Sequence, residues 1–258
     1  MQTIAEIKEI LAHADADELV VLDRALQADT RKGVIRALEQ AHKRCAAEQA
    51  ERERVDGLYC FQREIGGKGI LLGLDEVGRG PLAGPLVVGG VVLADEPHIL
   101  GLDDSKRLSS VRREEIAERV KREARAWTLQ SIPPEDIDEN GMAASLRRAF
   151  SAAIADIEAQ GVAVDAILLD GNPLHLDPRE VNIVGGDARC ASISAASIIA
   201  KVARDARMVA YAQEYPGYHF ESNKGYGSQE HIEAIRQLGL SPIHRRSFCH
   251  FDIQPSLF

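Results

Sequence analysis

Acidic side chains follow apolar runs at three separate points of the chain. One apolar run leads into Asp75 and Glu76, a second leads into Asp170, and a short third run is followed by two glycines and Asp187. Acids at solvated strand ends are common, and Asp187 alone could be a charge at the start of a helix. Three carboxylates brought to one edge of a sheet, however, would repel one another unless a cation neutralised them. The repeated pattern therefore favours a metal site.

All the candidate ligands are carboxylates, with no His or Cys among them. Hard oxygen ligands of this kind favour Mg²⁺ or Mn²⁺ over zinc. Two such ions, held ~3.5 to 4 Å apart, can activate water and stabilise the leaving oxygen of a phosphodiester. The predicted chemistry is metal-dependent hydrolysis of a phosphodiester, in which the substrate's own phosphate supplies further ligands.

Asp75 and Glu76 are adjacent, so in a continuous strand their side chains face opposite ways. Both can approach one site if the strand ends there and Glu76 turns with the following loop. That loop, from Gly78 to Gly84, has its third glycine one residue late for G-x-G-x-x-G, and Pro81 removes an amide donor. The chain also has no P-loop sequence. The loop thus argues against an oxidoreductase that binds a dinucleotide.

Several motifs occur together in one order from about residue 70 to the end of the chain. They are Leu74-Asp-Glu-Val-Gly-Arg-Gly-Pro-Leu-Ala-Gly-Pro, Leu102-Asp-Asp-Ser-Lys-Arg-Leu-Ser, Leu169-Asp-Gly-Asn, Gly185-Gly-Asp, Ala195-Ala-Ser-Ile-Ile-Ala-Lys-Val-Ala-Arg-Asp and Asn223-Lys-Gly-Tyr-Gly-Ser. In this order they resemble ribonuclease HII. The N-terminal helical extension resembles that of some bacterial members. In the related ribonuclease HIII, the fourth acid is usually glutamate and the extension is a sheet domain, so Asp187 and a helical extension favour the HII type.

The resemblance implies a ribonuclease H-like fold and metal-dependent cleavage of RNA in RNA/DNA hybrids. It further implies incision 5′ to a single ribonucleotide in duplex DNA, giving 3′-hydroxyl and 5′-phosphate ends, as in the removal of ribonucleotides from a genome. The family's four metal-binding acids correspond to Asp75, Glu76, Asp170 and Asp187.

The resemblance also assigns residues to substrate binding. The family's Gly-Arg-Gly motif corresponds to Gly78, Arg79 and Gly80, and its junction-sensing tyrosine to Tyr226. Glycines allow backbone groups to approach a 2′-hydroxyl closely. A tyrosine ring can stack on the next deoxynucleotide sugar, where a 2′-hydroxyl would crowd it. Without the motif, Tyr226 would be read as a half-buried tyrosine in a glycine-rich turn.

Other charged residues have weaker assignments. Arg79 can either touch a phosphate or brace the site by pairing with a carboxylate, and Lys106 is a candidate phosphate contact. Asp205 is expected to form a structural ion pair rather than to bind metal. Lys201 and Arg204 lie three residues apart and could share a face that meets phosphates, although helix-surface charges usually do nothing so specific. The spacing of the histidines does not indicate a metal site: His231, His244 and His250.

Apolar runs that alternate with helical segments predict an α/β domain with a mixed sheet flanked by helices. Strands are expected at residues 70–74, 86–93, 126–132, 166–169 and 181–184. Helices are expected at about residues 110–124, 138–160, 191–211 and 228–238, the last of them in an irregular C-terminal part that would help to hold the duplex.

The N-terminal part predicts three helices. The first carries an apolar stripe at Ile4, Ile7, Ile10 and Leu11, and the second one at Leu19, Val20, Leu22 and Leu26. Asp17 is the expected cap of the second helix, and Asp29 or Thr30 that of the third, which would run to about residue 55. A polar stretch and three glycines then suggest a border near residue 66, with an extension at residues 1–66 and a catalytic domain at residues 67–258.

The composition is that of an ordinary globular protein: 258 residues, 45% hydrophobic and 28% charged. The formal net charge of −9 argues against simple electrostatic binding of nucleic acid, so phosphates must be met locally or through metal. The four cysteines form no Cys-x-x-Cys pair, which argues against a zinc cage or disulfide framework. No signal peptide or membrane span is evident, so we expect a cytoplasmic protein, acting as a monomer.

Two alternatives remain open from the sequence. One is a noncatalytic protein that binds hybrids, against which the full set of four acids argues. The other is a different nuclease of the same fold that cuts DNA alone.

Overall fold

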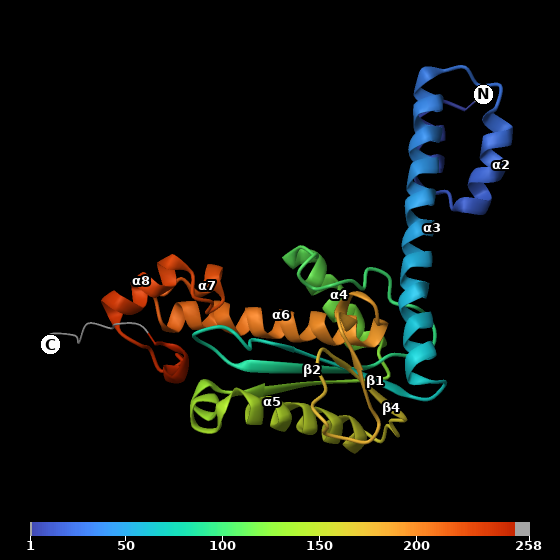
Figure 1. Ribbon diagram of the computed structural model, residues 1–258. Helices are drawn as coiled ribbons and strands as arrows, with labels where there is room; N and C mark the ends of the chain where they lie inside the picture. Colours follow the sequence, from blue (N-terminus) through green and yellow to red (C-terminus); the bar gives the residue numbers. More distant parts are fainter. Residues whose placement is uncertain (1, 251–258) are drawn as a thin grey trace. The chain divides into compact units, whose positions relative to one another are not determined.

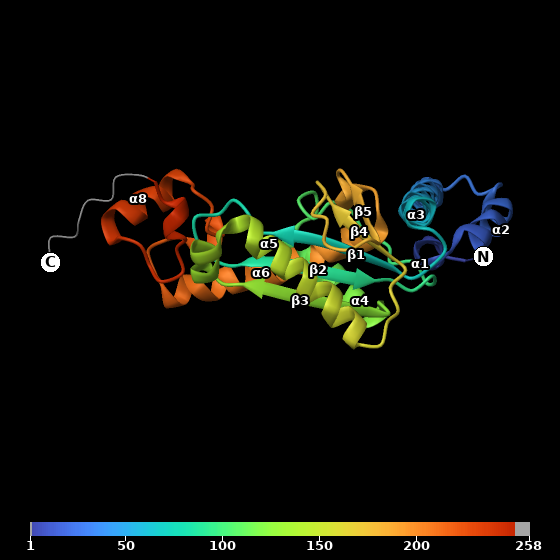
Figure 2. The same ribbon diagram turned by 60° about the horizontal axis from the view of Figure 1, so that its bottom comes forward.

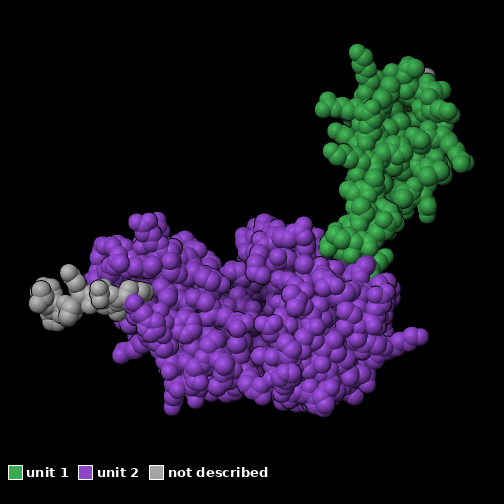
Figure 3. Space-filling model, viewed as in Figure 1, with its two compact units in different colours: residues 1–56 green, residues 57–258 purple. Residues whose placement is uncertain are grey.

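The computed structural model describes residues 2–250, which fall into two compact units (Figure 3). Unit 1 extends to Asp56, and unit 2 begins at Gly57. No helix among residues 2–250 is long and apolar enough to cross a membrane.

Unit 1 packs α1 (Ile4–His13), α2 (Ala16–Leu26) and the first part of α3 (Lys32–Gly66) around a small core. Thr3 forms a capping box with Glu6 at the start of α1, which satisfies backbone N–H groups that have no partner within the helix. The core side chains come from all three helices: Ile7, Leu11, Leu19, Val34, Ala37, Ala41 and Cys45. The three predicted N-terminal helices are thus present.

Two details predicted for these helices are wrong. The cap of α2 is Asp15, not Asp17, because Glu18 lies three residues after Asp15 and completes a second capping box. Ile10 and Val20 do not belong to the core, since their side chains are 41% and 52% exposed. On helices this short, only a narrow stripe faces the partner helices.

The third helix is longer than predicted, because it continues to Gly66 instead of ending near residue 55. The polar stretch that suggested a break supports the helix through pairs one turn apart, such as Arg54 with Glu51 at 2.8 Å. Asp29, one of the two predicted caps, accepts a hydrogen bond from the backbone N–H of Arg31 just before the helix. Helix α3 therefore contributes residues to both units.

Unit 2 is built on a five-stranded mixed sheet in the order β3-β2-β1-β4-β5. The strands are β1 (Leu71–Val77), β2 (Leu86–Val92), β3 (Ala126–Ile132), β4 (Ala166–Asp170) and β5 (Glu180–Ile183). β1, β2 and β3 form an antiparallel meander, whereas β4 pairs in parallel with β1, and β5 in parallel with β4. The predicted strands and the mixed α/β class are confirmed.

Helices cover both faces of this sheet (Figures 1 and 2). Helix α5 (Pro134–Ala159) packs on β2 and β3, and its buried residues share one core with Leu72 and Leu74 of β1. Helix α6 (Ala191–Glu214) packs on β1 and β2, where Gly73 and Gly89 allow its backbone to come close. A Cβ on Gly73 would lie 2.2 Å from the Ser192 backbone. Alternation along β1 therefore turns Asp75 toward α6.

Helix α4 (Ser110–Glu123) packs against α6, and the chain between β2 and α4 carries the predicted Lys106. Helix α5 begins four residues earlier than predicted, because Pro134 occupies its first position, and it is kinked at Gly141. After α6 come α7 (Phe220–Asn223), α8 (Gln229–Leu238) and the 3₁₀ turn η2 (Arg246–Phe248). This C-terminal part has an aromatic core of its own around Tyr218 and Phe220.

Candidate functional site

Asp75 and Asp170 lie where the two central parallel strands separate. The β1–β4 ladder ends at the pair Leu74 and Leu169, and the two aspartates are the next residues on their strands. Parallel strands keep equivalent positions side by side, so this register places the two carboxylates next to each other. The apolar runs before them are buried in the sheet and hold the register.

Glu76 does not turn with a loop as predicted. It lies within β1, which continues to Val77, and it pairs with Val88 of β2. Because β4 no longer pairs with β1 beyond Leu74, the β4 side of β1 is open from Asp75 onward. Glu76 can thus approach Asp170 while it remains in the strand.

The fourth acid, Asp187, is positioned by a glycine turn after β5. Gly185 has φ of 65°, and the 3₁₀ turn η1 (Gly186–Ala188) that follows contains the buried Asp187. The backbone N–H of Gly186 donates to Asp170 Oδ1 at 2.6 Å, which links this turn to the end of β4. A Cβ at Gly186 would lie only 2.6 Å from Cδ1 of the buried Ile193, so a larger residue there would need the Ile193 side chain to shift.

The acids lie close enough for their charges to raise one another's pKa. Burial raises the pKa of Asp75 well above its ordinary value, and the charges of Glu76 and Asp170 raise it further. Burial also raises the pKa of Glu76, against the opposing effect of Arg79. The pKa of Asp170 is raised by burial and by the charge of Asp187, although the Gly186 N–H opposes both. The folded chain therefore holds neighbouring negative charges that a cation would stabilise.

The donor set suits a hard divalent cation, because it consists of carboxylate oxygens. Among residues 2–250, no three His, Cys, Asp or Glu side chains already stand in an arrangement that could hold a metal ion. The four acids are neighbours, but their side chains would have to adjust to share an ion.

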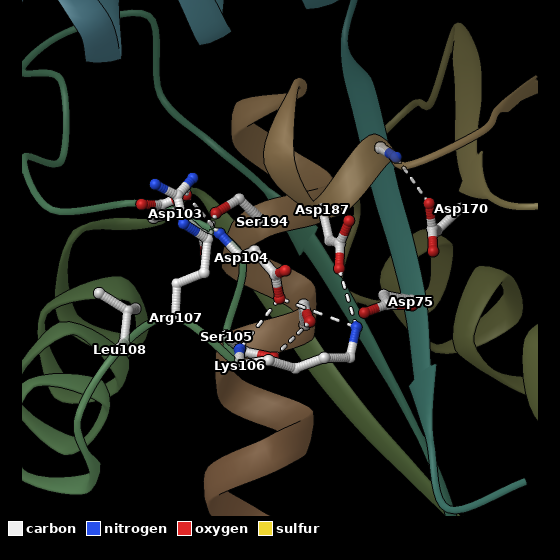
Figure 4. A network of polar contacts seen from close by, with 12 residues as sticks. Asp75, Asp103, Asp104, Ser105, Lys106, Arg107, Leu108, Asp170, Asp187 and Ser194 are labelled. Carbon is white, nitrogen blue, oxygen red and sulfur yellow. Dashed lines mark hydrogen bonds and ion pairs between the residues drawn. The ribbon is translucent and has the colours of Figure 1, made fainter.

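Lys106 reaches into this acidic group from the chain between β2 and α4 (Figure 4). Its Nζ lies 3.2 Å from Asp187 Oδ2 and 3.7 Å from Asp104 Oδ1, while the side chain remains 75% exposed. Burial lowers the pKa of this ammonium, but the hydrogen bond and charge of Asp187 outweigh that effect and raise the pKa overall. The sequence indicated a phosphate contact, and the structure shows a lysine paired with a candidate metal ligand.

Two serines of α6 that the sequence did not single out anchor the chain around Lys106. Ser194 Oγ donates to the carbonyl of Asp103 at 3.0 Å, and the hydroxyls of Ser197 and Ser105 are 3.0 Å apart. Ser197 also hydrogen-bonds Asp75 and thereby lowers its pKa, although burial dominates. Serines in an apolar helix carry no distinctive sequence signal, so only the fold shows this link.

Of the two roles considered for Arg79, the structure shows the pairing with a carboxylate. Arg79 Nη1 lies 3.3 Å from Glu76 Oε1, and its side chain is 62% exposed. A guanidinium with this exposure retains donors for a further ligand.

The two glycines of the Gly-Arg-Gly motif differ. Gly78 has φ of 97°, and a Cβ there would lie 2.5 Å from Arg204 Nε and 2.6 Å from the Pro85 carbonyl oxygen. Gly80 has no positive φ, and a Cβ there would meet no atom within 4 Å. The fold therefore requires glycine at Gly78 but not at Gly80.

Two buried arginines hold the glycine loop, and only one of them, Arg204, stood out in the sequence. Arg245 donates five hydrogen bonds to loop carbonyls, those of Gly78, Arg79, Pro81 and, twice, Gly84. Its guanidinium is fully buried, and burial together with the charge of the neighbouring Arg204 lowers its pKa to about 9. A basic residue near the end of a chain ordinarily reads as solvated, so nothing local revealed this role.

Arg204 is the second of these arginines, and it does not share a phosphate-binding face with Lys201. It is fully buried and donates to the carbonyls of Pro85, Ala83 and Lys224 at 3.0 to 3.1 Å. Burial lowers its pKa. Lys201 instead pairs with Asp205 at 2.8 Å, which confirms the expected structural ion pair.

Tyr226 lies in the turn between α7 and α8, and its side chain is among the exposed large hydrophobic ones, at 45%. Arg204 lies beneath the ring, 5.9 Å from its centroid. Gly225 before it has φ of 85°, and its carbonyl accepts from the Leu82 and Ala83 amides of the glycine loop. The structure thus joins the Tyr226 turn to the glycine loop through direct backbone contacts.

Comparison with known proteins supplies the family. The family model for ribonuclease HII matches residues 72–251, and the model for the ribonuclease HII N-terminal domain matches residues 3–66. The chain belongs to the ribonuclease HII family. Ribonuclease HII from Bacillus subtilis (strain 168) is 40% identical over 249 residues, 95% of this chain and 96% of that protein. The expected membership of the HII family is confirmed, and with it the enzyme class, a hydrolytic endonuclease.

Solved structures agree with the ribonuclease HII assignment. Ribonuclease H2 from Pyrococcus horikoshii OT3 is 28% identical with a TM-score of 0.58, covering 69% of this chain and 92% of that chain. RNase HII from Archaeoglobus fulgidus, solved in a complex with PCNA, is 25% identical with a TM-score of 0.62, covering 73% of this chain and 98% of that chain. The predicted ribonuclease H-like fold is confirmed.

Proposed function

We propose that this ribonuclease HII cleaves the RNA strand of RNA/DNA hybrids and incises 5′ to single ribonucleotides in duplex DNA, leaving 3′-hydroxyl and 5′-phosphate ends. The observation that carries the proposal is the group of neighbouring carboxylates where β1 and β4 separate, in a chain of this family. The biological role that we expect for such an activity is the removal of ribonucleotides from DNA.

Asp75, Glu76, Asp170 and Asp187 would hold Mg²⁺ or Mn²⁺, and the raised pKa values of Asp75, Glu76 and Asp170 support this assignment. When bound, the metal supplies Lewis-acid activation of water and charge stabilisation of the leaving oxygen. Before the metal binds, Lys106 partly neutralises Asp187. Its ammonium is exposed enough to move to a substrate phosphate when a cation takes its place.

Gly78, Arg79 and Gly80 would bind the ribonucleotide, with Arg79 contacting a phosphate. Open space at Gly80 would let the backbone approach a ribose 2′-hydroxyl, which both donates and accepts hydrogen bonds. The exposed ring of Tyr226 would stack on the deoxynucleotide sugar that follows. The direct contacts between the two segments would fix the distance between these subsites.

Cleavage assays on three duplexes test this function: one with a single ribonucleotide, one RNA/DNA hybrid and one of DNA alone. We expect cleavage of the first two with Mg²⁺ or Mn²⁺, and none with chelator. Cleavage of the DNA duplex would favour a DNA nuclease of the same fold, and binding without any cleavage would favour a noncatalytic protein.

Tyr226→Ala tests the junction role within the same assays. We expect a loss of about tenfold or more on the single-ribonucleotide duplex and a much smaller loss on the long hybrid, because only the former presents a junction beside every cleavage site. Equal losses on both substrates would contradict a junction-sensing role for this residue.

A further inference from the structure

Two buried histidines connect the backbone of Ser241 to the carbonyl of Tyr226. The Ser241 N–H lies 2.9 Å from His244 Nδ1, and His244 Nε2 lies 3.0 Å from His231 Nε2. His231 Nδ1 lies 2.8 Å from the Tyr226 carbonyl oxygen. The two rings thus form one continuous chain of hydrogen bonds between two turns.

The ends of this chain determine the tautomer of each histidine. His244 Nδ1 lies near both the backbone N–H of Ser241 and, at 2.7 Å, its Oγ. A backbone N–H can only donate, so His244 Nδ1 must accept from it, the hydroxyl can then only donate to the same nitrogen, and the proton of a neutral His244 is on Nε2. A carbonyl oxygen can only accept, so His231 Nδ1 must carry the proton that it donates to Tyr226. Between the rings, His244 Nε2–H then donates to the free lone pair of His231 Nε2. The two ends require the same arrangement independently.

The surroundings of the pair favour this neutral form. His231 is fully buried and His244 is 3% exposed, and both pack against the aromatic rings of Tyr218 and Phe220. The charge of His219 also disfavours protonation of His231. Burial lowers the pKa of both rings, that of His244 to about 4.

The backbone of Tyr226 is the point at which this chain of hydrogen bonds meets the proposed substrate surface. Its N–H donates to the Asn223 carbonyl at 3.0 Å, and its carbonyl accepts from the Ser228 N–H at 2.8 Å as well as from His231. Two polar rings in an aromatic core are costly unless every donor and acceptor is paired. A leucine would fill such a core without that requirement, so the pairing indicates a need for defined geometry.

We propose that His231 and His244 are positioning residues that hold the Tyr226 turn in place against the substrate. They do so through this chain of hydrogen bonds, called the relay below, in which every donor points toward Tyr226, and they thereby set the preference for single-ribonucleotide junctions. This inference rests on the proposed role of Tyr226. Neither histidine touches the reacting atoms, so the relay affects the choice of substrate and leaves the hydrolytic step itself unaffected.

Variants at His231 test whether this residue acts as a hydrogen-bond donor to the Tyr226 carbonyl or only fills space in the aromatic core. His231→Leu removes the donor, and we expect kcat/KM on the single-ribonucleotide duplex to fall about tenfold relative to the long hybrid. His231→Asn places an amide N–H near the Nδ1 position and should restore most of that ratio. His175→Asn is the control, since His175 is an exposed histidine in the chain between β4 and β5 and is not part of this chain of hydrogen bonds, and it should leave the ratio unchanged.

Nitrogen chemical shifts of the wild-type histidines give a readout that does not depend on a variant folding. We expect the proton of His244 on Nε2 and that of His231 on Nδ1 at neutral pH. Any other pair of tautomers overturns the relay. So would an unchanged substrate ratio in folded His231→Leu while Tyr226→Ala changes it. If Tyr226→Ala itself leaves the ratio unchanged, the proposed role of Tyr226 fails instead, whatever the tautomers are.

Discussion

The acidic site and the loop segments beside it satisfy their polar groups in opposite ways. At the ends of β1 and β4, buried carboxylates repel one another, and the pKa of Asp75, Glu76 and Asp170 is raised. In the glycine loop and the Tyr226 turn, buried basic side chains donate to backbone carbonyls. One region is left with excess negative charge, whereas in the other the buried donors are paired with backbone carbonyls.

This difference indicates that the acidic group needs a cation from outside, whereas the loop segments are already paired within the fold. The acidic group becomes electrostatically favourable only when a cation arrives from outside, so its geometry can remain adjustable until then. The recognition segments are held in place before any substrate binds, which reduces the entropy lost on binding. Under the proposed function, catalysis would depend on an added ion, and selection of the substrate would depend on preorganised backbone.

The largest expected effect comes from Asp170→Asn, which weakens the acidic region as a cation site. We expect cleavage of every substrate to fall by about 10³-fold or more, because a metal ligand is lost. Folding should be intact, since an asparagine oxygen can still accept from the Gly186 N–H. Without added metal, thermal unfolding should occur at the same or a higher temperature, because a repelling charge is removed.

Metal titration completes this test without substrate. Mg²⁺ or Mn²⁺ should raise the unfolding temperature of the wild type, because a ligand that binds only the folded state stabilises it, and the rise should shrink in Asp170→Asn. Wild-type turnover in the variant would remove Asp170 from the site.

The next effect separates the two glycines of the recognition loop. Gly80→Ala should keep full stability, because its added methyl group meets open space, yet reduce cleavage at ribonucleotides by about 10²-fold by holding the ribose away. Gly78→Ala should instead destabilise the fold by about 1–3 kcal/mol, because of its φ of 97° and the contact with Arg204. Denaturant unfolding and cleavage rates of both variants check the pair. An active Gly80→Ala enzyme would show that the open space serves another purpose.

The smallest effect concerns the pH dependence of stability. His244 has an ordinary pKa of 6.5 and a folded pKa of about 4, so between these values the unfolded chain binds the proton more readily. Stability is therefore highest, as far as this group is concerned, above pH 6.5. It is lost as the pH falls toward 4, by about 3 kcal/mol. The carboxylates with raised pKa act with the opposite sign, because their charged forms destabilise the fold as the pH rises.

Denaturant unfolding of wild type and His244→Asn across pH 4 to 7 separates the contribution of His244 to the pH dependence of stability from that of the carboxylates. The difference in unfolding free energy between the two proteins should shrink as the pH falls. A difference that stays constant would mean that His244 is not held neutral in the folded protein.

Much of the fold could be predicted from the sequence, because its signals are local. The apolar runs that became β1 to β5 and the helix that became α6 are long and regular enough to identify directly. Errors arose where a local signal had two meanings. A polar stretch suggested the end of α3 but continues it, and Asp17 suggested a cap where Asp15 is the cap.

The candidate site was predictable only in part. The four acids each follow a recognisable pattern, and their roles as metal ligands stay a prediction. The site is supported by residues without any such pattern, among them Ser197, His231 and Arg245. Ser197 is hydrogen-bonded to Ser105, 92 residues away along the chain, and Arg245 to Arg79, 166 residues away, so no local rule could identify these partners.

By itself, the sequence determined which residue types are available for chemistry, and the order along the chain of the strands that would carry them. Apolar periodicity and acids at strand ends are properties of short segments, and short segments keep them in any fold. Only the tertiary structure decided that β1 and β4 separate beside Asp75 and Asp170, and that Arg245 lies beneath the glycine loop. Burial and the pairing of buried polar groups depend on residues distant in sequence, which meet only when the chain is folded.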